Sequence, residues 1–433
     1  MRIRPLPLAL LAAVCSPAPG AAQKGVSLTQ LTEIAKSRSE RIRPELLKKL
    51  APHLEVLSKD REREWVAIDA ASAEVVKLGD TIIPLLLEKL DPRSGRPEER
   101  NLARNCAGIL AKLDPASFVD ALIDILEGER YDSETLVVPL LGLSGSPRAG
   151  EALTRMMDRA DPRQKALILQ ALAKLNYRSA ALVVAKQLPF AEERLNSAAV
   201  AYLEQVAAPV VVPEVRRVLK AAKLPSQIML YARLLGRCSK EDIESADVLL
   251  EFFKNTKLDR VQLGEVARIL GTVAPVGHDP TIERLRSVIK ESENPGDLEL
   301  DCAITLRRMG DKQGPEKLRA ALISRTRSPK TKRQFIYWNY LGDYYLAFDQ
   351  PKQAATAFRK AYDNAQGENV RTMLQIKLAR AEARQSHWTQ VRNALRDSRG
   401  SLSALQQELT KHPELAEAAK HRPVKEFLES FPK

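Results

Sequence analysis

An apolar pattern recurs along the middle of the chain, and it constrains the fold more than any other feature. Each copy has an apolar or small pair, an apolar residue three positions after the pair, and a last apolar residue three positions further on. In one copy these are Cys106-Ala107, Leu110 and Leu113. Because a helix has 3.6 residues per turn, these offsets place the side chains on one helical face. Successive copies are 30 to 36 residues apart and end at Leu78, Leu113, Leu143, Leu175, Val206, Cys238, Val273 and Met309.

A second apolar pair, with members four residues apart, follows each copy at a steady distance. Leu86 and Leu90 form the first such pair, and Leu318 and Leu322 form the last. Gly and Pro occur in the connectors, as in Gly79-Asp80, and signal the end of one helix and the start of the next. The repeated unit is therefore predicted to be a pair of antiparallel helices.

The last of these units resembles a known repeat. The segment Leu306-Arg-Arg-Met309-Gly310-Asp311 is followed by Pro315, Leu318 and Leu322, and together they look like a HEAT-type repeat of the short bacterial kind. Leu270-Gly271 carries the same tail in the preceding unit. The resemblance covers residues 65–324 and implies a superhelical scaffold.

The next segment resembles a tetratricopeptide repeat. The pattern W-x2-L-G-x2-Y … A-x3-F-x2-A is matched by Trp338, Leu341-Gly342, Tyr345, Ala354, Phe358 and Ala361. The small residues Gly342 and Ala354 let the two helices approach, and the aromatic side chains fill the gap between them. A weaker copy follows, with Leu378-Ala379 and Val391. It departs from the pattern at Glu382, where an aromatic residue is expected.

Together these patterns predict an all-α fold, a right-handed α-solenoid of antiparallel helix pairs with HEAT-like repeats followed by tetratricopeptide-like repeats. The low aromatic content of 5% also favours helices packed on helices. The expected segments are a signal peptide at 1–22, an N-terminal helical cap at 23–64, the HEAT-like solenoid at 65–324, a basic linker at 325–334, tetratricopeptide-like helix pairs at 335–400 and a C-terminal helical cap at 401–433.

The first 22 residues have the three parts of a secretory signal peptide. Arg2 and Arg4 supply positive charge, and Pro5–Val14 is an apolar run too short to cross a bilayer. Small residues then precede a cleavage site near Ala22. We therefore expect an exported, periplasmic bacterial protein with no transmembrane span, a membrane anchor or buried helix being the alternative. A lipoprotein attached through Cys15 is not expected, because the preceding residues do not form a lipobox.

The chain shows no motif that identifies catalytic, cofactor or metal chemistry. None of its five histidines lies three or four residues from another His or Cys. Gly145–Gly150 has the spacing of a phosphate loop, but Glu151 follows where such a loop needs Lys. Cys106, Cys238 and Cys302 fall on packed helical faces, which favours core thiols over nucleophiles. We therefore expect no enzyme activity, no cofactor and no metal site.

The net charge of +13 is concentrated near the end of the chain. Residues 325–433 contain 20 Lys or Arg against 11 Asp or Glu, a net of +9. The linker contributes Arg325, Arg327, Lys330, Lys332 and Arg333. In an exported protein this segment favours an anionic envelope surface over nucleic acid, which we do not expect as a partner. A solvated linker is the alternative reading.

Three consecutive second helices are expected to carry a basic residue at the same register position: Arg155, Lys186 and Arg217. Because second helices of HEAT-like units usually line the concave surface, this stripe would fit an acidic extended segment of a partner. The alternative is three charges that merely solvate a helical face. In the tetratricopeptide-like part, Asn339 and Asp343 are expected to face the groove.

The sequence therefore favours a non-catalytic protein–protein interaction scaffold of the bacterial cell envelope, which binds a partner along a concave solenoid surface. Two alternatives stay open. One is an enzyme or enzyme accessory subunit that uses the array as a substrate platform. The other is a peripheral binder of an anionic envelope surface through the basic C-terminal part. The expected partner is a protein, and the sequence does not indicate the oligomeric state.

Overall fold

The computed structural model describes residues 44–90, 96–127, 134–254, 258–328, 334–398 and 402–430. Every regular element in these ranges is a helix, so the described part of the chain has the predicted all-α fold. The chain divides into two compact units, one up to Val215 and one from Arg216 onward, and we describe each by itself. The expected signal peptide and residues 23–43 of the expected N-terminal cap lie outside the described ranges.

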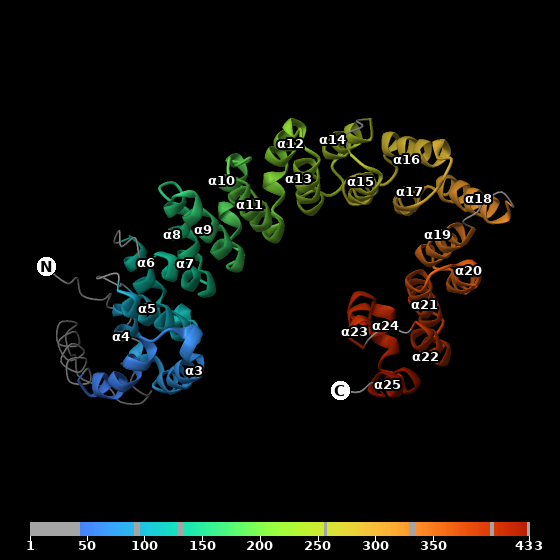
Figure 1. The fold of residues 1–433 in the computed structure, drawn as a ribbon. Helices are drawn as coiled ribbons and strands as arrows, with labels where there is room; N and C mark the ends of the chain where they lie inside the picture. The colour runs from blue at the N-terminus through green and yellow to red at the C-terminus, as the bar shows by residue number, and fades with distance from the viewer. Residues whose placement is uncertain are drawn as a thin grey trace, which may run out of the picture. The chain divides into compact units, whose positions relative to one another are not determined.

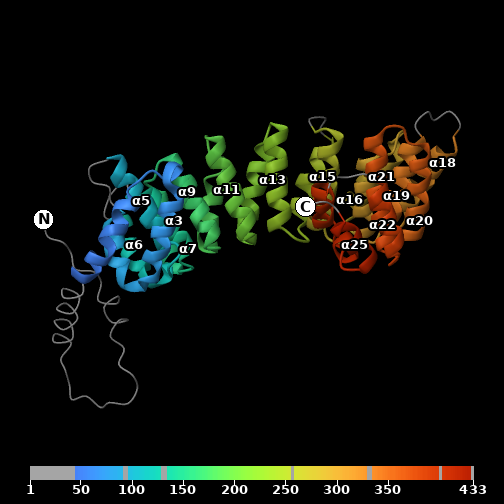
Figure 2. The same cartoon turned by 60° about the horizontal axis from the view of Figure 1, so that its bottom comes forward.

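The first unit is a succession of short helices (Figure 1). They are a helix over residues 44–57, α3 (Arg61–Lys77), α4 (Ile83–Glu88), α5 (Pro97–Leu110), α6 (Val119–Glu127), α7 (Glu134–Leu143), α8 (Pro147–Met157), α9 (Pro162–Lys174), α10 (Ala181–Lys186) and α11 (Glu193–Val206). The helices α3, α5, α7, α9 and α11 contact one another in turn, and α6 contacts α8. First and second helices of the predicted pairs therefore form separate rows, and Figure 2 shows α9 and α11 side by side.

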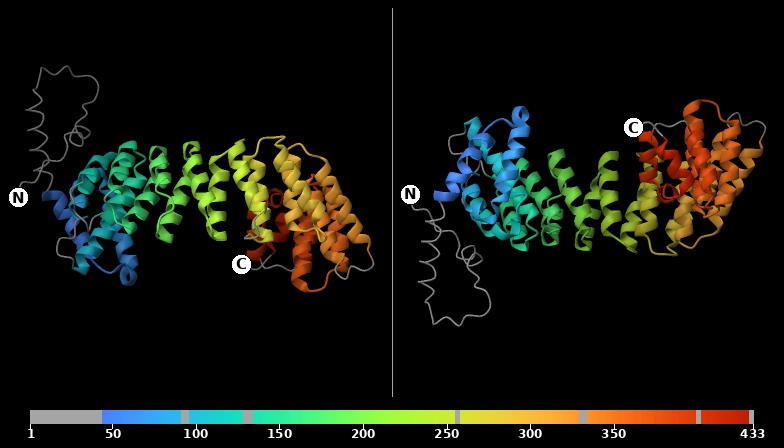
Figure 3. Two further views of the ribbon diagram at one scale, coloured as in Figure 1. Left: turned by 90° about the horizontal axis from the view of Figure 1, so that it is seen from above. Right: turned by 90° about the horizontal axis from the view of Figure 1, so that it is seen from below.

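The second unit continues with longer helices, and the boundary between the units falls within α12. The helices are α12 (Val212–Ala221), α13 (Pro225–Cys238), α14 (Ile243–Lys254), α15 (Arg260–Val273), α16 (Asp279–Glu291), α17 (Asp297–Arg308), α18 (Gln313–Arg327), α19 (Gln334–Ala347), α20 (Pro351–Asn364), α21 (Glu368–Ala383), α22 (Trp388–Asp397), α23 (Leu402–Lys411), α24 (Pro413–Ala418) and α25 (Arg422–Glu429). In this unit α13, α15, α17 and α19 contact one another in turn, and so do α14, α16 and α18. These two sets form two layers, and the red and orange helices of the unit pack together in both views of Figure 3.

The eight apolar patterns of the sequence coincide with the first helices, from α3 to α17. Their inner positions form the core: Cys106 and Leu110, for example, are fully buried. The last residue of the pattern is buried in several copies, as at Val206 and Val273, but not in the third copy. Leu143 closes α7 and is 48% exposed, because the chain leaves the packed face there. The periodicity therefore predicted the helices correctly but extended the buried face too far in this copy.

The ends of the helices carry the expected local signals. Asp161 and Gln164 form a capping box at the start of α9, in which each side chain accepts a hydrogen bond from the other residue's backbone N–H. Proline stands at the first or second position of α13, α16, α20, α24 and α25, where a backbone N–H would have no partner within the helix. Gly310 follows α17 with a φ of 85°, a left-handed conformation that glycine adopts without steric cost.

The helix pair α19–α20 has the close contact that its sequence predicts. A Cβ atom at Gly342 would lie 2.4 Å from the ring of Phe358, so only glycine fits between the two helices. Phe358 and Ala354 are fully buried, and the Lys360 ammonium lies 4.5 Å from the centre of the Trp338 ring.

The last three helices cover the apolar face of α21 and α22. Leu405, Leu415 and Val424 are buried in one cluster with Val391 and Leu395. In this part of the chain α25 contacts α22, and α24 contacts α21. No helix in the described ranges is both long and apolar enough to cross a membrane.

Two expected segment boundaries differ from the helices. The cap expected at 23–64 ends inside α3, which begins at Arg61. The linker expected at 325–334 is shorter, because α18 continues to Arg327 and α19 begins at Gln334. Arg325 and Arg327 therefore belong to the last turn of a helix, which ends just before Pro329, a residue that disfavours helical backbone at the position preceding it.

Candidate interaction site

Ion pairs link successive first helices in the second unit. Each joins residues 32 to 34 positions apart, which is one repeat length: Arg233 with Glu265, Arg268 with Asp301, Lys377 with Asp343, and Arg380 with Glu414. Their oxygen–nitrogen distances are 2.5, 3.3, 2.6 and 2.8 Å. The layer of first helices is therefore held together by charge as well as by apolar contact.

A cavity of about 480 Å³ opens in this layer, beside the start of α17. It is lined by Arg260 and Val261 of α15, by residues 294–298 and by Ile336, Tyr337 and Tyr340 of α19. The loop before α17 is held in place by Glu299, which accepts a hydrogen bond of 2.8 Å from the backbone N–H of Gly296. This contact fixes the wall of the cavity that lies nearest to the helix start.

Apolar groups form much of the cavity surface. Val261 is 75% exposed, the largest exposure among the large apolar side chains that the structure describes. Leu298, Ile336 and the rings of the two tyrosines complete this part of the lining. An exposed apolar surface inside a concave site is typical of binding sites rather than of solvated helical faces.

The polar groups of the cavity are ordered by hydrogen bonds. The hydroxyl of Tyr340 donates to Oδ2 of Asp297 at 3.3 Å, and the hydroxyl of Tyr337 lies 3.1 Å from Oδ1 of Asn294. The Arg260 guanidinium donates to both oxygens of the buried Glu299 at 2.7 Å. These contacts fix the tyrosine rings relative to α17, so the cavity is preformed.

Burial and nearby carboxylates shift the pKa of two acidic groups at or beside the cavity. Burial, the Asp297 carboxylate and the more distant charges of Asp343 and Glu299 raise the pKa of Tyr340 to about 12. Burial also raises the pKa of Asp301, one helical turn from Asp297, to about 6, with Asp297 adding to the shift and Arg268 opposing it. Both shifts are in the direction that nearby carboxylates produce.

The structure brings together the two groove residues expected in the tetratricopeptide-like part. Asn339 and Asp343 lie on one face of α19, and Lys377 of α21 contacts both, at 2.9 Å and 2.6 Å. Burial raises the pKa of Asp343, although the Lys377 ammonium acts in the opposite direction. These residues are therefore engaged with the next helix pair.

The expected basic stripe is distributed over both units. Arg155 is exposed on α8 and pairs with Glu127 of α6 at 2.8 Å. Lys186 is exposed at the end of α10. Arg217 is exposed on α12 in the second unit and has a partner of its own.

The basic residues expected to form a linker are only partly described. The Arg325 guanidinium donates to the backbone carbonyl of Glu293, and Arg327 is exposed beside a second cavity of about 420 Å³ on α18. Lys330, Lys332 and Arg333 lie outside the described residues.

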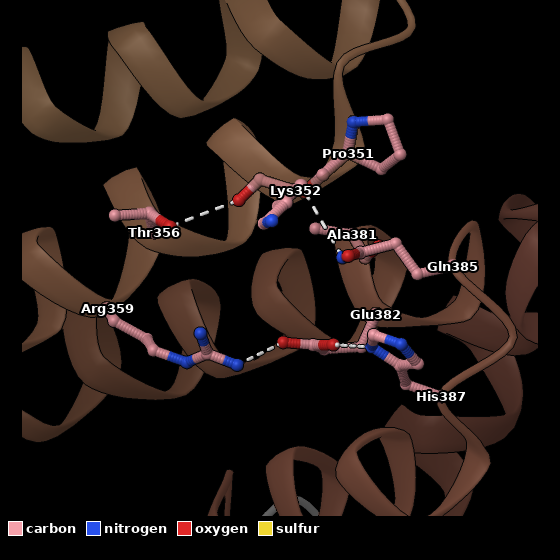
Figure 4. Close-up of polar contacts among 8 residues, drawn as sticks. All are labelled: Pro351, Lys352, Thr356, Arg359, Ala381, Glu382, Gln385 and His387. Carbon is pink, nitrogen blue, oxygen red and sulfur yellow. Dashed lines mark hydrogen bonds and ion pairs between the residues drawn. The ribbon is translucent and has the colours of Figure 1, made fainter.

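A buried carboxylate occupies the position where the weaker tetratricopeptide-like copy lacks its aromatic residue. Glu382 is 2% exposed and lies between Arg359 of α20 and His387, which precedes α22 (Figure 4). The Arg359 guanidinium donates to one oxygen of Glu382, and Nδ1 of His387 lies 2.8 Å from the other. This position therefore links three helix segments through charge instead of aromatic packing.

The described cysteines are buried and form no disulfide with one another, and their burial agrees with their predicted core positions. Burial raises the pKa of the Cys106 thiol to about 12 and raises that of Cys302 as well. Both thiols are therefore protonated at neutral pH and are poor nucleophiles. Among the described residues no three His, Cys, Asp or Glu side chains gather as a metal ion would require.

Sequence reasoning missed Val261, Asp297, Tyr337 and Tyr340. It placed the binding residues of the HEAT-like part on the second helices, whereas the cavity lies at the starts of the first helices. An available signal was the pair of tyrosines three residues apart, outside the matched repeat positions.

Comparison with known proteins adds little to this description. No protein-family model matches the chain, and no curated protein is significantly similar to it. Seven solved chains are similar, and one of them is an engineered protein whose crystal structure comes from the Northeast Structural Genomics Consortium. The two chains are 16% identical, with 80% of this chain and 98% of that chain covered and a TM-score of 0.36. At this score the likeness does not bear on function.

Proposed function

We propose that the protein is a non-catalytic protein–protein interaction scaffold of the bacterial cell envelope. The sequence contributes the signal peptide, which indicates export to the periplasm, and the resemblance to HEAT and tetratricopeptide repeats. In this proposal the antiparallel helix pairs continue into one right-handed α-solenoid, whose first helices carry the binding surface. A stack of such pairs offers an extended surface in place of a single deep active site.

The observation that carries the proposal is the cavity beside α17. Its apolar lining includes the exposed Val261, and its hydroxyl and carboxylate groups are already oriented by internal hydrogen bonds. A preformed site of this kind binds a partner side chain without first having to order its own groups. Its volume lies within the roughly 300–1,000 Å³ that is typical of ligand sites.

The charged groups near the cavity are engaged in contacts within the fold. The carboxylates Glu299, Asp301 and Asp343 each lie within 4 Å of a cation, and burial raises the pKa of the Tyr340 phenol to about 12. These contacts support a binding role, in which the apolar groups of the cavity and Asp297 meet the partner.

Photo-cross-linking in the cell tests this function. Val261 and Val276 are 75% and 72% exposed, but only Val261 lines the cavity. Benzoylphenylalanine placed at 261 should give a protein adduct of defined mass in the envelope of the producing bacterium. The same group at 276 should give none, and recovery of no adduct at 261, or of the same adduct from both positions, contradicts the proposal.

A further inference from the structure

The charges around the cavity are unevenly paired. Three carboxylates near it have a cation each: Glu299 has Arg260, Asp301 has Arg268 and Asp343 has Lys377. Asp297 lines the cavity itself, and its hydrogen-bond donor is the neutral hydroxyl of Tyr340. Among the residues that the structure describes, Asp297 forms no ion pair, unlike these three carboxylates.

The arginine in the lining does not supply the missing charge. Arg260 contacts both oxygens of Glu299 at 2.7 Å, and Glu299 is fully buried. One nitrogen of the guanidinium makes both contacts, so the charge of Arg260 is directed at Glu299. Burial is the largest cause of the raised pKa values of Tyr340 and Asp301, and the Asp297 carboxylate adds to both shifts.

The rest of the lining fits a long aliphatic side chain. Val261, Leu298 and Ile336 provide apolar contacts, and the two tyrosine rings add aromatic surface. Lysine and arginine have apolar stems that pack on such surfaces while their charged ends reach a polar group. Aromatic rings also attract a cation that approaches their faces.

We propose that this cavity binds a lysine or arginine side chain of an extended segment of the partner protein, an inference that rests on the proposed function. The stem lies along Val261 and Ile336, and the cationic group donates to the carboxylate of Asp297 and the amide oxygen of Asn294. An acidic segment, which the sequence suggested for the basic second-helix residues, fits less well here, because its carboxylates would meet Asp297, and the Arg260 guanidinium already pairs with Glu299.

Three matched peptides test the ligand class on the full chain. They are acetylated and amidated pentapeptides of sequence Gly-Leu-X-Leu-Gly, with lysine, norleucine or glutamate at X. Lysine and norleucine differ mainly in the terminal ammonium group, and saturation-transfer NMR titration detects weak complexes. We expect the lysine peptide to bind at least about fivefold more tightly than the norleucine peptide, since hydrogen bonds between charged groups are the stronger ones.

Three variants locate the binding effect in the cavity. Asp297→Asn should reduce the affinity for the lysine peptide to that for norleucine, and the exposed Glu283→Gln on α16 should leave the ratio unchanged. Val261→Ser should weaken the binding of the lysine and norleucine peptides alike.

Three outcomes overturn the inference: equal binding of the lysine and norleucine peptides, tighter binding of the glutamate peptide, or a preference for lysine that survives in Asp297→Asn. If no peptide binds but position 261 still cross-links to a protein, the inference fails while the scaffold function stands. Absence of that adduct counts against the function itself.

Discussion

The ammonium of Lys377 on α21 lies 2.6 Å from Oδ2 of Asp343 on α19. The side chains of the pair are only 20% and 18% exposed, and burial raises the pKa of Asp343 despite the opposing charge of Lys377. The two groups have therefore lost most of their water and depend on each other. Lys377 also donates to Asn339, so one cation holds both groove residues that the sequence singled out.

Removal of this cation should destabilise the second unit. In Lys377→Met the carboxylate of Asp343 stays buried without its partner, and we expect a loss of about 3–5 kcal/mol in the free energy of unfolding. The double variant Lys377→Met/Asp343→Asn should recover most of that loss, because the amide carries no charge. Urea unfolding can be followed by tryptophan fluorescence in a Trp65→Phe background, where the remaining tryptophans, Trp338 and Trp388, both lie in the second unit. Equal stability of the single and double variants would show that the carboxylate is solvated.

Asp301 should make stability depend on pH between about 4 and 6. Burial raises its pKa from 3.8 to about 6, so the folded chain binds the proton more readily than the unfolded chain. The stabilising contribution is therefore fully present below pH 4 and is lost as the pH rises through 6. Asp301→Asn removes this titration and keeps an oxygen for Arg268, which lies 3.3 Å from the carboxylate.

The measurement compares the unfolding free energy of the unaltered chain with that of Asp301→Asn at several pH values. From pH 4 to pH 7.5 the unfolding free energy of Asp301→Asn should rise by about 2–3 kcal/mol relative to the unaltered chain, since one pKa unit corresponds to about 1.4 kcal/mol. Urea unfolding at four pH values is sufficient. A difference that stays constant with pH would mean that Asp301 titrates normally.

Gly342 should not tolerate even a methyl group. In Gly342→Ala the Cβ would lie 2.4 Å from the ring of Phe358, and we expect a cost of about 1–3 kcal/mol from overpacking. Gly108 provides the matched control, because it also lies within a helix and has no atom within 4 Å of a built Cβ. Gly108→Ala should stabilise its helix by about 0.5–1 kcal/mol. Hydrogen exchange in α19 and α5 measures the two changes in stability. A change of the same sign in both variants would contradict the close contact between Gly342 and Phe358.

Glu382 should need a cation beside it for the second unit to be stable. Arg359→Met leaves this buried carboxylate with His387 as its remaining contact in the group of Figure 4, and should cost several kcal/mol at neutral pH. Arg359→Met/Glu382→Met removes both charges and should be clearly more stable than the single variant. Thermal unfolding followed by circular dichroism ranks the two chains. A double variant that is less stable than Arg359→Met would mean that the Glu382 carboxylate does not depend on Arg359.

The helices and their packing were predictable because they depend on local patterns. Offsets of three and four residues are enough to place Cys106 and Leu110 on a buried face. The contact between Gly342 and Phe358 follows from a repeat pattern that spans only two adjacent helices. The exposed end of α7 at Leu143 shows where that reasoning stops, since the pattern does not reveal the last helical turn.

The cavity was not predictable in the same way, because it depends on contacts between distant residues. Arg260 and Glu299 are 39 positions apart in the sequence. Tyr340, whose hydroxyl donates to Asp297, is 43 positions from it. Neither pair belongs to a repeat signature, and Glu382 likewise replaces a signature residue with a charge whose partners come from two other segments. Such contacts depend on how successive helices are offset, which residue spacing alone does not determine.

The central claim is that a partner protein contacts the cavity at Val261. The most direct test is the dissociation constant of the cross-linked partner, once purified, for Val261→Ser and for the equally exposed control Val276→Ser. The account predicts binding about tenfold weaker for Val261→Ser, because a buried valine is worth about 1.5 kcal/mol or more, and unchanged binding for Val276→Ser. Equal affinity of both variants and the unaltered chain would contradict it.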